Sequence, residues 1–228
     1  MKKLFTLVLL INVLAIYSKT DGKKLIYRFD INREIGPVAW RITQKAVDEA
    51  TKQKADFLLL KLNTYGGMVD AADSIRTKIL NCTIPVLVFI DNNAASAGAL
   101  IAISCDSIYM RNGANIGAAT VVDQQGKVVP DKYQSYMRSI MRSTAEAHGK
   151  KAVVNGKDTS WIWYRDPKIA EAMVDPRTYI KGLNDTGKVL TMTTSEAMEH
   201  GFCEGKAENI NQVLEKAVIL PVNCIEFA

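Results

Sequence analysis

The chain has 228 residues, of which 48% are hydrophobic, 23% charged and 7% aromatic. These proportions exclude a disordered, collagen-like or disulfide-scaffolded chain, and the length favours one globular domain. The formal net charge is +5, and Lys2 and Lys3, in the leader predicted next, supply two of these charges. The remainder is too small to indicate a nucleic-acid partner.

The N-terminus has the three parts of a secretory signal. Two lysines precede an apolar block from Leu4 to Tyr17, and a polar stretch follows from Ser18. As a helix the block would span roughly 21 Å, less than the roughly 30 Å hydrocarbon core of a bilayer. We predict a signal peptide over residues 1–18, with a short N-terminal anchor as the alternative. The mature chain is then exported, to the periplasm or another extracytoplasmic space.

The four cysteines show no C-x-x-C spacing, so we expect neither a metal site nor a cofactor. A chain of this size does not need disulfides to hold its core. Cys105 lies among apolar residues, where a buried thiol is usual. A bridge between Cys203 and Cys224 remains open.

From Leu25 onward, strand-like and helix-like segments alternate, which indicates an α/β fold. We predict strands at 25–29, 55–62, 85–90, 107–110 and 188–192. We predict helices at 37–51, 68–80, 95–103, 131–149, 168–174, 195–200 and 210–217. Segments 113–126, 156–163 and 176–185 are predicted to be loops.

Two helices have patterns that predict which face is buried. In the helix at 37–51, apolar residues recur every four positions, at Val38, Ile42, Ala46 and Ala50. The helix at 131–149 is predicted to begin at an Asp131 N-cap and to stop at Gly149. Its apolar stripe is Tyr133, Met137, Ile140, Met141 and Thr144.

A paired glycine, Gly66-Gly67, stands between a predicted buried strand and a helix, in the sequence Asn63-Thr64-Tyr65-Gly66-Gly67. Glycines at such a turn expose backbone N–H groups and let a ligand carbonyl approach closely, as an oxyanion hole requires. A tight turn with positive φ is the alternative interpretation.

Ser96 also lies between an apolar strand and a helix, within Ala94-Ala95-Ser96-Ala97-Gly98. Its neighbours are small enough to admit a substrate backbone, and the helix N-terminus favours developing negative charge. A plain N-cap is the competing interpretation.

Lys132 is the candidate base for this serine. The two histidines, His148 and His200, each end a predicted helix beside a glycine, where the helix dipole favours them, so a Ser-His-Asp triad is not expected. Lys132 lies in a helical first turn, where the macrodipole disfavours an ammonium, and a lysine base is a known variant of the triad. Most lysines at such positions are simply solvated, which is the alternative.

Taken in order, these segments resemble the membrane-associated serine proteases of the NfeD family, the stomatin operon partner proteins, in the Clp protease and crotonase superfamily. The resemblance covers roughly Leu25 to Lys216. It rests on six stretches: YRFDINREIGPVAW (27–40), LNTYGGMVDAA (62–72), AASAGAL (94–100), ANIGAA (114–119), the segment 131–150 with its RSTAEAHGK ending, and EAMVDP (171–176).

The resemblance implies a Clp protease/crotonase-like fold of stacked β-β-α units, with residues 19–228 as the protease domain. It implies Ser96 as the nucleophile and Lys132 as the catalytic lysine of a Ser-Lys dyad. The oxyanion hole would come from the N–H groups of Gly67 and Ala97, with Gly66 forming the turn.

The resemblance also implies a substrate class: apolar segments of proteins, including those of stomatin-like membrane proteins. Tyr65, Met68 and the loop from Ile116 and Gly117 to Val122 are the expected substrate-binding residues, with core packing as the alternative for Tyr65 and Met68. Because Clp-like folds commonly oligomerise, we expect a homo-oligomer. Long family members continue into membrane helices and a small β-barrel domain, whereas this chain ends at Ala228 as a short form or a truncated product.

Three other functions remain open. They are a crotonase-type acyl-thioester enzyme, an enzyme like signal-peptide peptidase, and a non-catalytic scaffold that binds a membrane protein. The aromatic cluster Trp161, Trp163 and Tyr164 is predicted to be a lid packed on the core, or else a subunit contact or substrate flap.

Overall fold

The computed structural model describes residues 23–156, 158–217 and 219–227. The predicted leader, residues 1–18, lies outside the described residues. The fold is built on a mostly parallel sheet in the order β10-β1-β2-β3-β4-β9, to which β5 adds beside β3 and β8 beside β5. Only the β5–β8 pair in this sheet is antiparallel, so the predicted α/β class is confirmed.

The strands are β1 (Lys24–Ile31), β2 (Phe57–Thr64), β3 (Val86–Ala95), β4 (Ser107–Met110), β5 (Asn115–Gly117), β6 (Lys150–Asn155), β7 (Asp158–Trp163), β8 (Thr191–Thr193), β9 (Gly205–Lys206) and β10 (Val222–Glu226). The helices are α1 (Pro37–Lys52), α2 (Val69–Leu80), α3 (Ala97–Ser104), α4 (Asp131–Glu146), α5 (Pro167–Ala172), α6 (Thr194–Glu199) and α7 (Ile210–Lys216).

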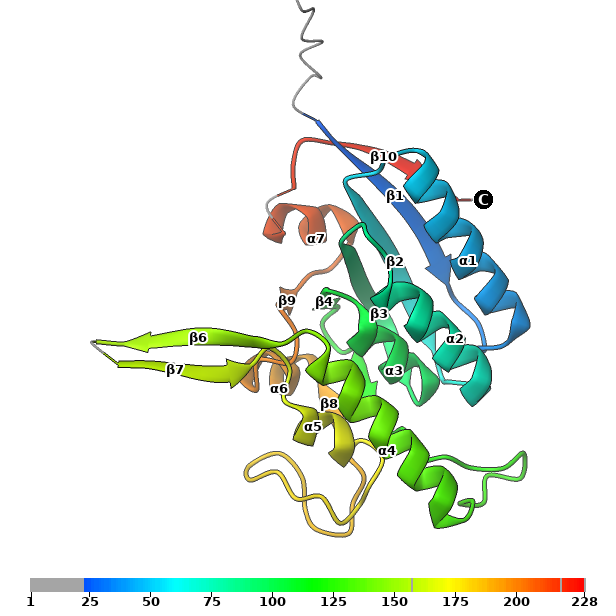
Figure 1. The fold of residues 1–228 in the computed structure, drawn as a ribbon, viewed down its shortest axis with the longest axis vertical. Coiled ribbons are helices and arrows are strands. Elements are labelled where there is room, and N and C mark those ends of the chain that lie inside the picture. Colours follow the sequence, from blue (N-terminus) through cyan, green and yellow to red (C-terminus); the bar gives the residue numbers. More distant parts are fainter. Residues whose placement is uncertain (1–22, 157, 218, 228) are drawn as a thin grey trace, which may run out of the picture.

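The sheet is covered on both faces, which explains the nearly continuous apolar runs of its central strands. Helices α1 to α4 form a row over one face, while α7 packs on the other (Figure 1). Alternate residues of β2 point to the two sides: Leu58, Leu60 and Leu62 join the large core, and Leu59 joins the smaller core beneath α7.

The buried faces of two helices differ from the predicted ones. In α1, Val38 is 53% exposed, and the buried face is Ala39, Thr43, Ala46, Val47 and Ala50. A row spaced by four drifts around a helix with 3.6 residues per turn, so Val38 rotates out of the core. In α4, Tyr133 is 50% exposed and Gln134 is buried in its place.

The ends of α4 also correct the prediction. Pro130 is the N-cap, without a side-chain bond, and Asp131 is the first helical residue. The helix ends at Glu146, and Gly149 follows with φ +70°, in the turn that leads to β6.

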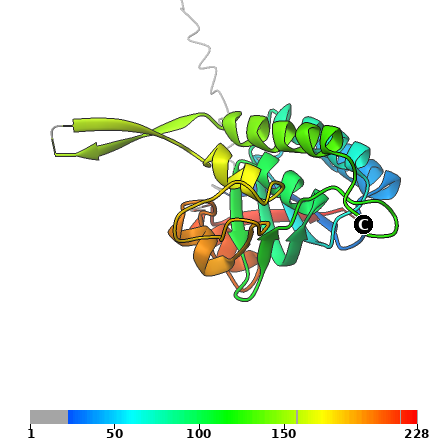
Figure 2. The same cartoon turned by 90° about the horizontal axis from the view of Figure 1, so that it is seen from below.

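Strands β6 and β7 form an antiparallel hairpin, so residues 158–163 are not part of the loop predicted for 156–163. The hairpin projects from the body as an arm (Figures 1 and 2). Trp161 is 66% exposed, so the predicted lid packed on the core is wrong. Gly156, directly after the last paired residue of β6, was the available signal for a turn between two strands.

The C-terminal strand β10, which pairs with the edge of β1, was also not predicted. It carries Cys224, which is exposed, whereas Cys203 is buried. Both thiols are free, so these two residues form no bridge. Within residues 23–156, 158–217 and 219–227, no helix combines the length and apolarity needed to cross a bilayer.

Candidate active site

The candidate site lies where β2 and β3 end. Strands β2 and β3 run parallel and side by side, and their pairing extends to Thr64 and Ala94. The Gly66-Gly67 turn follows β2, and Ser96 follows β3 directly before α3. The carboxyl ends of parallel strands meet at one edge of a sheet, which brings the two predicted motifs together.

Ser96 has a strained backbone, with φ +55° and ψ −120°. It is the N-cap of α3, but its side chain makes no capping hydrogen bond, which removes the plain N-cap interpretation. Its N–H donates to Gly117 O at 2.8 Å, and its carbonyl accepts from Ala99 N at 2.9 Å. A non-glycine residue held in this region costs about 1–3 kcal/mol and is typical of functional positions.

Gly66 packs directly against Ser96. A Cβ added to Gly66 would lie 2.6 Å from Ser96 Cβ and 3.1 Å from Ser96 Oγ, at a φ of +115°. The Thr64 hydroxyl fixes this turn, because its Oγ1 accepts from Gly66 N at 3.1 Å and also lies 3.2 Å from Gly66 O. The second glycine, Gly67, packs against Ile35, where an added Cβ would lie 2.1 Å from the Ile35 carbonyl oxygen.

The backbone N–H groups of Gly67 and Ala97, near Ser96, have no hydrogen-bond acceptor among the described residues. Ala97 opens α3, so its N–H lies at the positive end of the helix dipole. Free N–H groups of this kind are what a developing oxyanion needs.

A cavity of about 780 Å³ opens beside Ser96. Most of its wall is apolar, and Asp123 and Glu34 supply the acidic groups. The lining residues are Glu34, Tyr65, Gly67, Met68, Val69, Ala72, Ser96, Ala97, Ala118, Ala119, Thr120, Val121, Val122, Asp123, Gln124, Met137 and Val189. Tyr65 (81% exposed) and Met68 (48% exposed) thus stand in the wall of this cavity and not in the core.

A row of asparagines crosses the strand ends beneath the site. Asn63 Nδ2 donates to Asn32 Oδ1 at 3.0 Å, and Asn63 Oδ1 accepts from the backbone of Asn93 at 3.2 Å. Asn115 Nδ2 then donates to Asn93 Oδ1 at 2.9 Å. We call these four residues the asparagine row; it ties together the ends of β1, β2, β3 and β5.

Lys132 is exposed in the first turn of α4, with its Nζ 5.2 Å from the centre of the Tyr133 ring. It is not among the residues that line the Ser96 cavity, to which α4 contributes Met137. Lys132 is five residues from Met137, which corresponds to about 7.5 Å along the helix axis.

Gln134, which sequence reasoning missed, joins α4 to the cavity wall. Its side chain is buried, accepts from Val121 N at 3.0 Å and donates to Val121 O at 2.6 Å. A polar residue in an otherwise apolar helix stripe was the available signal.

Ile116 is fully buried, and the carbonyl of Gly117 accepts from Ser96 N–H, so neither residue lines the Ser96 cavity.

The two histidines lie elsewhere. His148 Nε2 lies 2.7 Å from Ile103 O, and burial of the ring, followed by the nearby Arg165, lowers the pKa of His148. His200 is the C-cap of α6. Neither histidine lines the Ser96 cavity, which agrees with the absence of a histidine role in the predicted dyad.

A comparison with models of known protein families identifies the family of this chain. The family model described as "NfeD1b, N-terminal domain" matches residues 25–223. The chain belongs to the NfeD1b N-terminal domain family.

The curated relatives that the chain matches are longer. Membrane protein NfeD1b of Bacillus subtilis (strain 168) is 30% identical over 211 residues, which cover 92% of this chain and 45% of the relative. Membrane-bound protease PH1510 of Pyrococcus horikoshii is 26% identical over 226 residues, which cover 94% of this chain and 45% of the relative. The chain therefore spans about half the length of the curated NfeD relatives it matches.

Solved structures show the fold. The 1510-N membrane-bound stomatin-specific protease, solved as a serine-to-alanine mutant, matches with a TM-score of 0.74 and 23% identity over 90% of this chain and 98% of that chain. A lysine-to-alanine mutant of the same protease, in complex with a substrate peptide, has a TM-score of 0.72. ClpP1 from Listeria monocytogenes matches with a TM-score of 0.55 and 15% identity, over 81% of this chain and 92% of that chain. This NfeD chain has the predicted Clp protease-like fold.

Proposed function

We propose that this chain is a serine endopeptidase with a Ser-Lys dyad that cleaves apolar segments of proteins. The observation that carries the proposal is the strained Ser96, which opens α3, packs against Gly66 of the Gly66-Gly67 turn and lines a mostly apolar cavity. Strain at a strand-to-helix turn is how a nucleophilic serine is exposed in other hydrolases.

The proposed reaction is acyl transfer. Ser96 Oγ attacks the peptide carbonyl and passes its proton to the Lys132 amine, and the N–H groups of Gly67 and Ala97 stabilise the oxyanion. The protonated lysine then gives its proton to the leaving amine. Water hydrolyses the acyl-enzyme by the same route and frees Ser96.

Lys132 must approach Ser96 for this reaction, and its long flexible stem at the exposed start of α4 allows such a movement. Its present position outside the cavity favours the second candidate, a non-catalytic scaffold that binds a membrane protein. The two candidates differ in turnover, which is measurable.

We further propose the substrate and the location from the relatives. PH1510 is named a membrane-bound protease and 1510-N a stomatin-specific protease. By extension, the substrate of this chain is a protein or peptide with an apolar segment, such as a stomatin-like membrane protein. We place residues 19–228, the proposed protease domain, outside the cytoplasm and next to a membrane. Tyr65 and Met68 are the proposed substrate contacts.

We also propose a homo-oligomer in which the β6–β7 arm contacts a second copy. An isolated two-stranded hairpin is only marginally stable in water, and this one exposes Trp161, Trp163 and Val154 on one face. The arm starts at the end of α4 opposite Lys132, and none of its residues lines the Ser96 cavity.

The deciding experiment is cleavage of an unbiased peptide library by the full chain, read by mass spectrometry. We expect wild type to cut near apolar residues, and Ser96→Ala and Lys132→Ala to lose at least about a hundredfold in rate while remaining folded by circular dichroism. Ser139→Ala and Lys127→Ala, which remove exposed residues of the same types, are the matched controls and should cut like wild type.

Equal cleavage by wild type and both dyad variants would rule out the dyad. An absence of cleavage by every folded protein in the series would favour the scaffold instead.

A further inference from the structure

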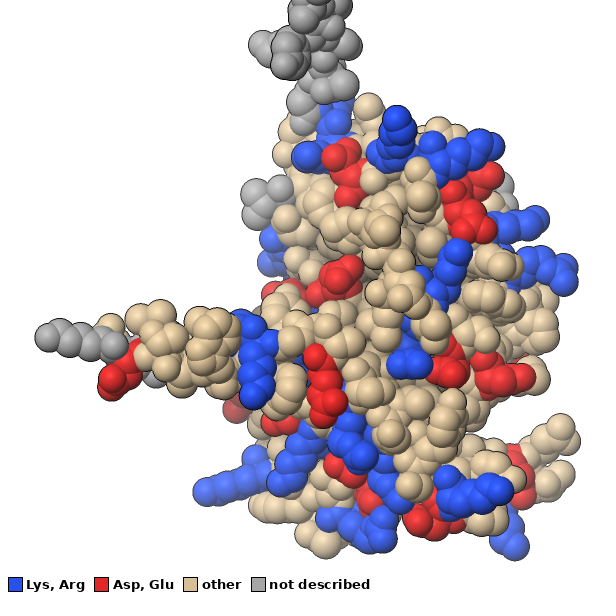
Figure 3. All heavy atoms as spheres, in the orientation of Figure 1, with Lys and Arg blue, Asp and Glu red and all other residues tan. Residues whose placement is uncertain are grey.

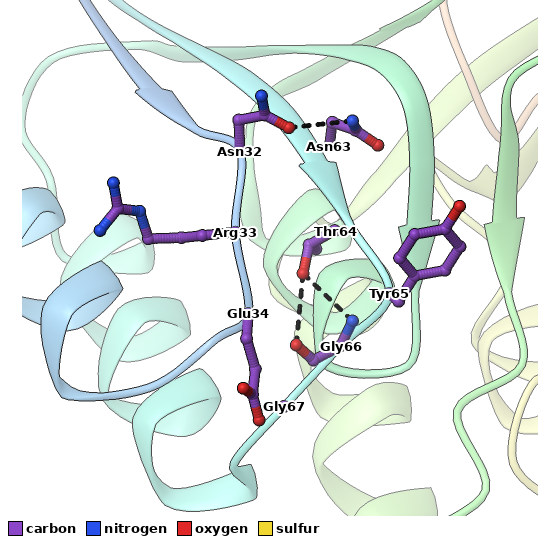
Figure 4. Close-up of a pocket in the computed structure, with 8 residues that line it drawn as sticks. All are labelled: Asn32, Arg33, Glu34, Asn63, Thr64, Tyr65, Gly66 and Gly67. Carbon is purple, nitrogen blue, oxygen red and sulfur yellow. Dashed lines mark hydrogen bonds between the residues drawn. The ribbon is translucent and has the colours of Figure 1, made fainter.

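A second cavity, of about 520 Å³, lies on the other side of the Gly66-Gly67 turn from the apolar one. It is formed by the loop after β1 and by the end of β2 (Figure 4). Its polar side chains include Asn32, Glu34, Asn63 and Thr64. We call it the polar cavity.

The polar cavity and the Ser96 cavity share a wall. Glu34, Tyr65 and Gly67 line both of them. Tyr65 is exposed, with 81% of its surface accessible to solvent. An extended peptide with its reacting carbonyl at Gly67 N–H therefore has an apolar cavity on one side and the polar cavity on the other.

The shared wall is fixed to the proposed oxyanion turn. Ile35 N donates to Gly66 O, and Met68 N donates to Ile35 O, each at 2.8 Å. Glu34 directly precedes Ile35, so its position follows that of the turn. A ligand held at Glu34 is thus held in register with Ser96.

Glu34 is the acidic residue among those that line the polar cavity, and Arg33 is the basic one. The Glu34 carboxylate points toward Gly67, whereas the neighbouring Arg33 extends away from the other lining side chains (Figure 4). In the described part of the chain, Glu34 forms no ion pair, although it is exposed. A carboxylate without an ion-pair partner suits a cationic, hydrogen-bonding group.

We propose that the polar cavity is a second substrate subsite, in which Glu34 selects a lysine or arginine side chain. The inference rests on the proposed peptidase function and adds its specificity: the substrate is apolar on one side of the scissile bond and basic on the other. Glu34 is the specificity-determining residue.

The test measures binding apart from cleavage. Peptides with a fixed apolar block and a single Lys or Gln at successive flanking positions are titrated into the full chain carrying Ser96→Ala, followed by fluorescence anisotropy. At one position the Lys peptide should bind roughly three- to fivefold more tightly than its Gln partner, the range expected of a solvent-accessible ion pair. The preference should shrink as salt is added.

Adding Glu34→Gln to this protein should abolish the Lys preference. Glu208→Gln is the matched control, because this exposed glutamate lines neither cavity, and it should retain the preference. Circular dichroism checks that both proteins are folded.

The inference is overturned if Lys and Gln peptides bind equally at every position, if no peptide binds, or if the preference survives Glu34→Gln. If the preference is present but the wild-type chain cleaves nothing, the polar cavity stands as a binding site and the peptidase proposal alone fails. If wild type cleaves without a basic preference, the peptidase stands and the subsite fails.

Discussion

Ser96 depends on its neighbours to hold a conformation that serine disfavours. Gly117 accepts from its N–H, and Gly66 leaves room for its side chain. The strain is therefore compensated by contacts from two other segments of the chain, and either segment is a place where the nucleophile can be disturbed without being replaced.

Replacing Gly66 by alanine tests this dependence. The new Cβ would lie 2.6 Å from Ser96 Cβ, at a φ of +115° that disfavours any side chain. We expect Gly66→Ala to lower the free energy of unfolding by at least about 2 kcal/mol, measured in urea, and to remove any cleavage activity.

Gly126→Ala is the control for the backbone penalty alone. Gly126 has φ +78° and no atom within 4 Å of an added Cβ, so a loss of about 1 kcal/mol is expected. Equal losses for the two variants would show that contact with Ser96 contributes nothing.

At the scale of residues, the sequence predicted that Ser96 and Gly66-Gly67 lie at strand-to-helix turns. Ser96 and Gly66-Gly67 each follow a strand and precede a helix, a pattern visible within ten residues. Gln134 and the asparagine row were missed, because a buried amide is recognised by its partner. Val121 is 13 positions from Gln134, and Asn63 is 31 from Asn32.

The first turn of α4, which carries Lys132, is held by charge. Arg138 on α4 lies 3.1 Å from Asp131 Oδ1 and 3.5 Å from Asp175 Oδ2. Arg177 closes the cluster, with its guanidinium 2.7 Å from Asp175 Oδ2. Side-chain hydrogen bonds from Arg177 are the main reason that the pKa of Asp175 falls to about 2.

Asp175→Asn should weaken this cluster in a pH-dependent way. The pKa of Asp175 lies below its unfolded value of 3.8, so its ionised form stabilises the fold above about pH 4, and this contribution disappears as pH falls toward 2. We expect the variant to lose roughly 1–2 kcal/mol in urea unfolding at pH 7, with the difference from wild type closing on acidification.

Asp185→Asn provides the comparison. Asp185 pairs with Lys188 at 2.9 Å, but both side chains are more than two thirds exposed, so its removal should change stability little. If the free energy of unfolding of Asp175→Asn stays below that of wild type by the same amount from pH 7 to pH 2, the electrostatic explanation is wrong.

At the scale of elements, the predicted helices and central strands are found with shifts of a few residues. The exceptions are β5, β6, β7, β9 and β10. Four of these are short or exposed strands without a full apolar pattern, and β10 is defined by its pairing with β1 almost 200 residues earlier. Pairing across such distances leaves no local periodicity to find.

The arm changes the shape of the whole molecule. It extends from an otherwise rounded body, and its visible surface is mostly uncharged (Figure 3). At its base, Lys150 Nζ lies 4.5 Å from the centre of the Trp163 ring. An apolar arm of this kind is expected to be covered in an assembly.

The arm therefore makes the proposed homo-oligomer testable. We expect the full chain to sediment as an oligomer in analytical ultracentrifugation, and Trp161→Lys to shift it toward the monomer, with at least a tenfold weaker association constant. Tyr179→Lys, which alters another exposed aromatic residue outside the arm, should leave the mass unchanged. A Trp161→Lys protein with the wild-type mass would assign the contact to another surface.

For the molecule as a whole, the alternation of segments and the resemblance together predicted the fold class, while the arm required the structure. The sequence of apolar and polar residues around Trp161 is compatible both with a lid packed on the core and with an exposed hairpin. What separates these two is whether the body of the protein lies beneath them, which no local pattern records.

The asparagine row has one last consequence, for how this protein is studied. Amide side chains neither gain nor lose a proton at ordinary pH and carry no net charge, so the hydrogen bonds of this row do not themselves titrate. A change of cleavage rate with pH therefore reports on titrating groups outside this row, among them Asp175 in the cluster that holds the first turn of α4.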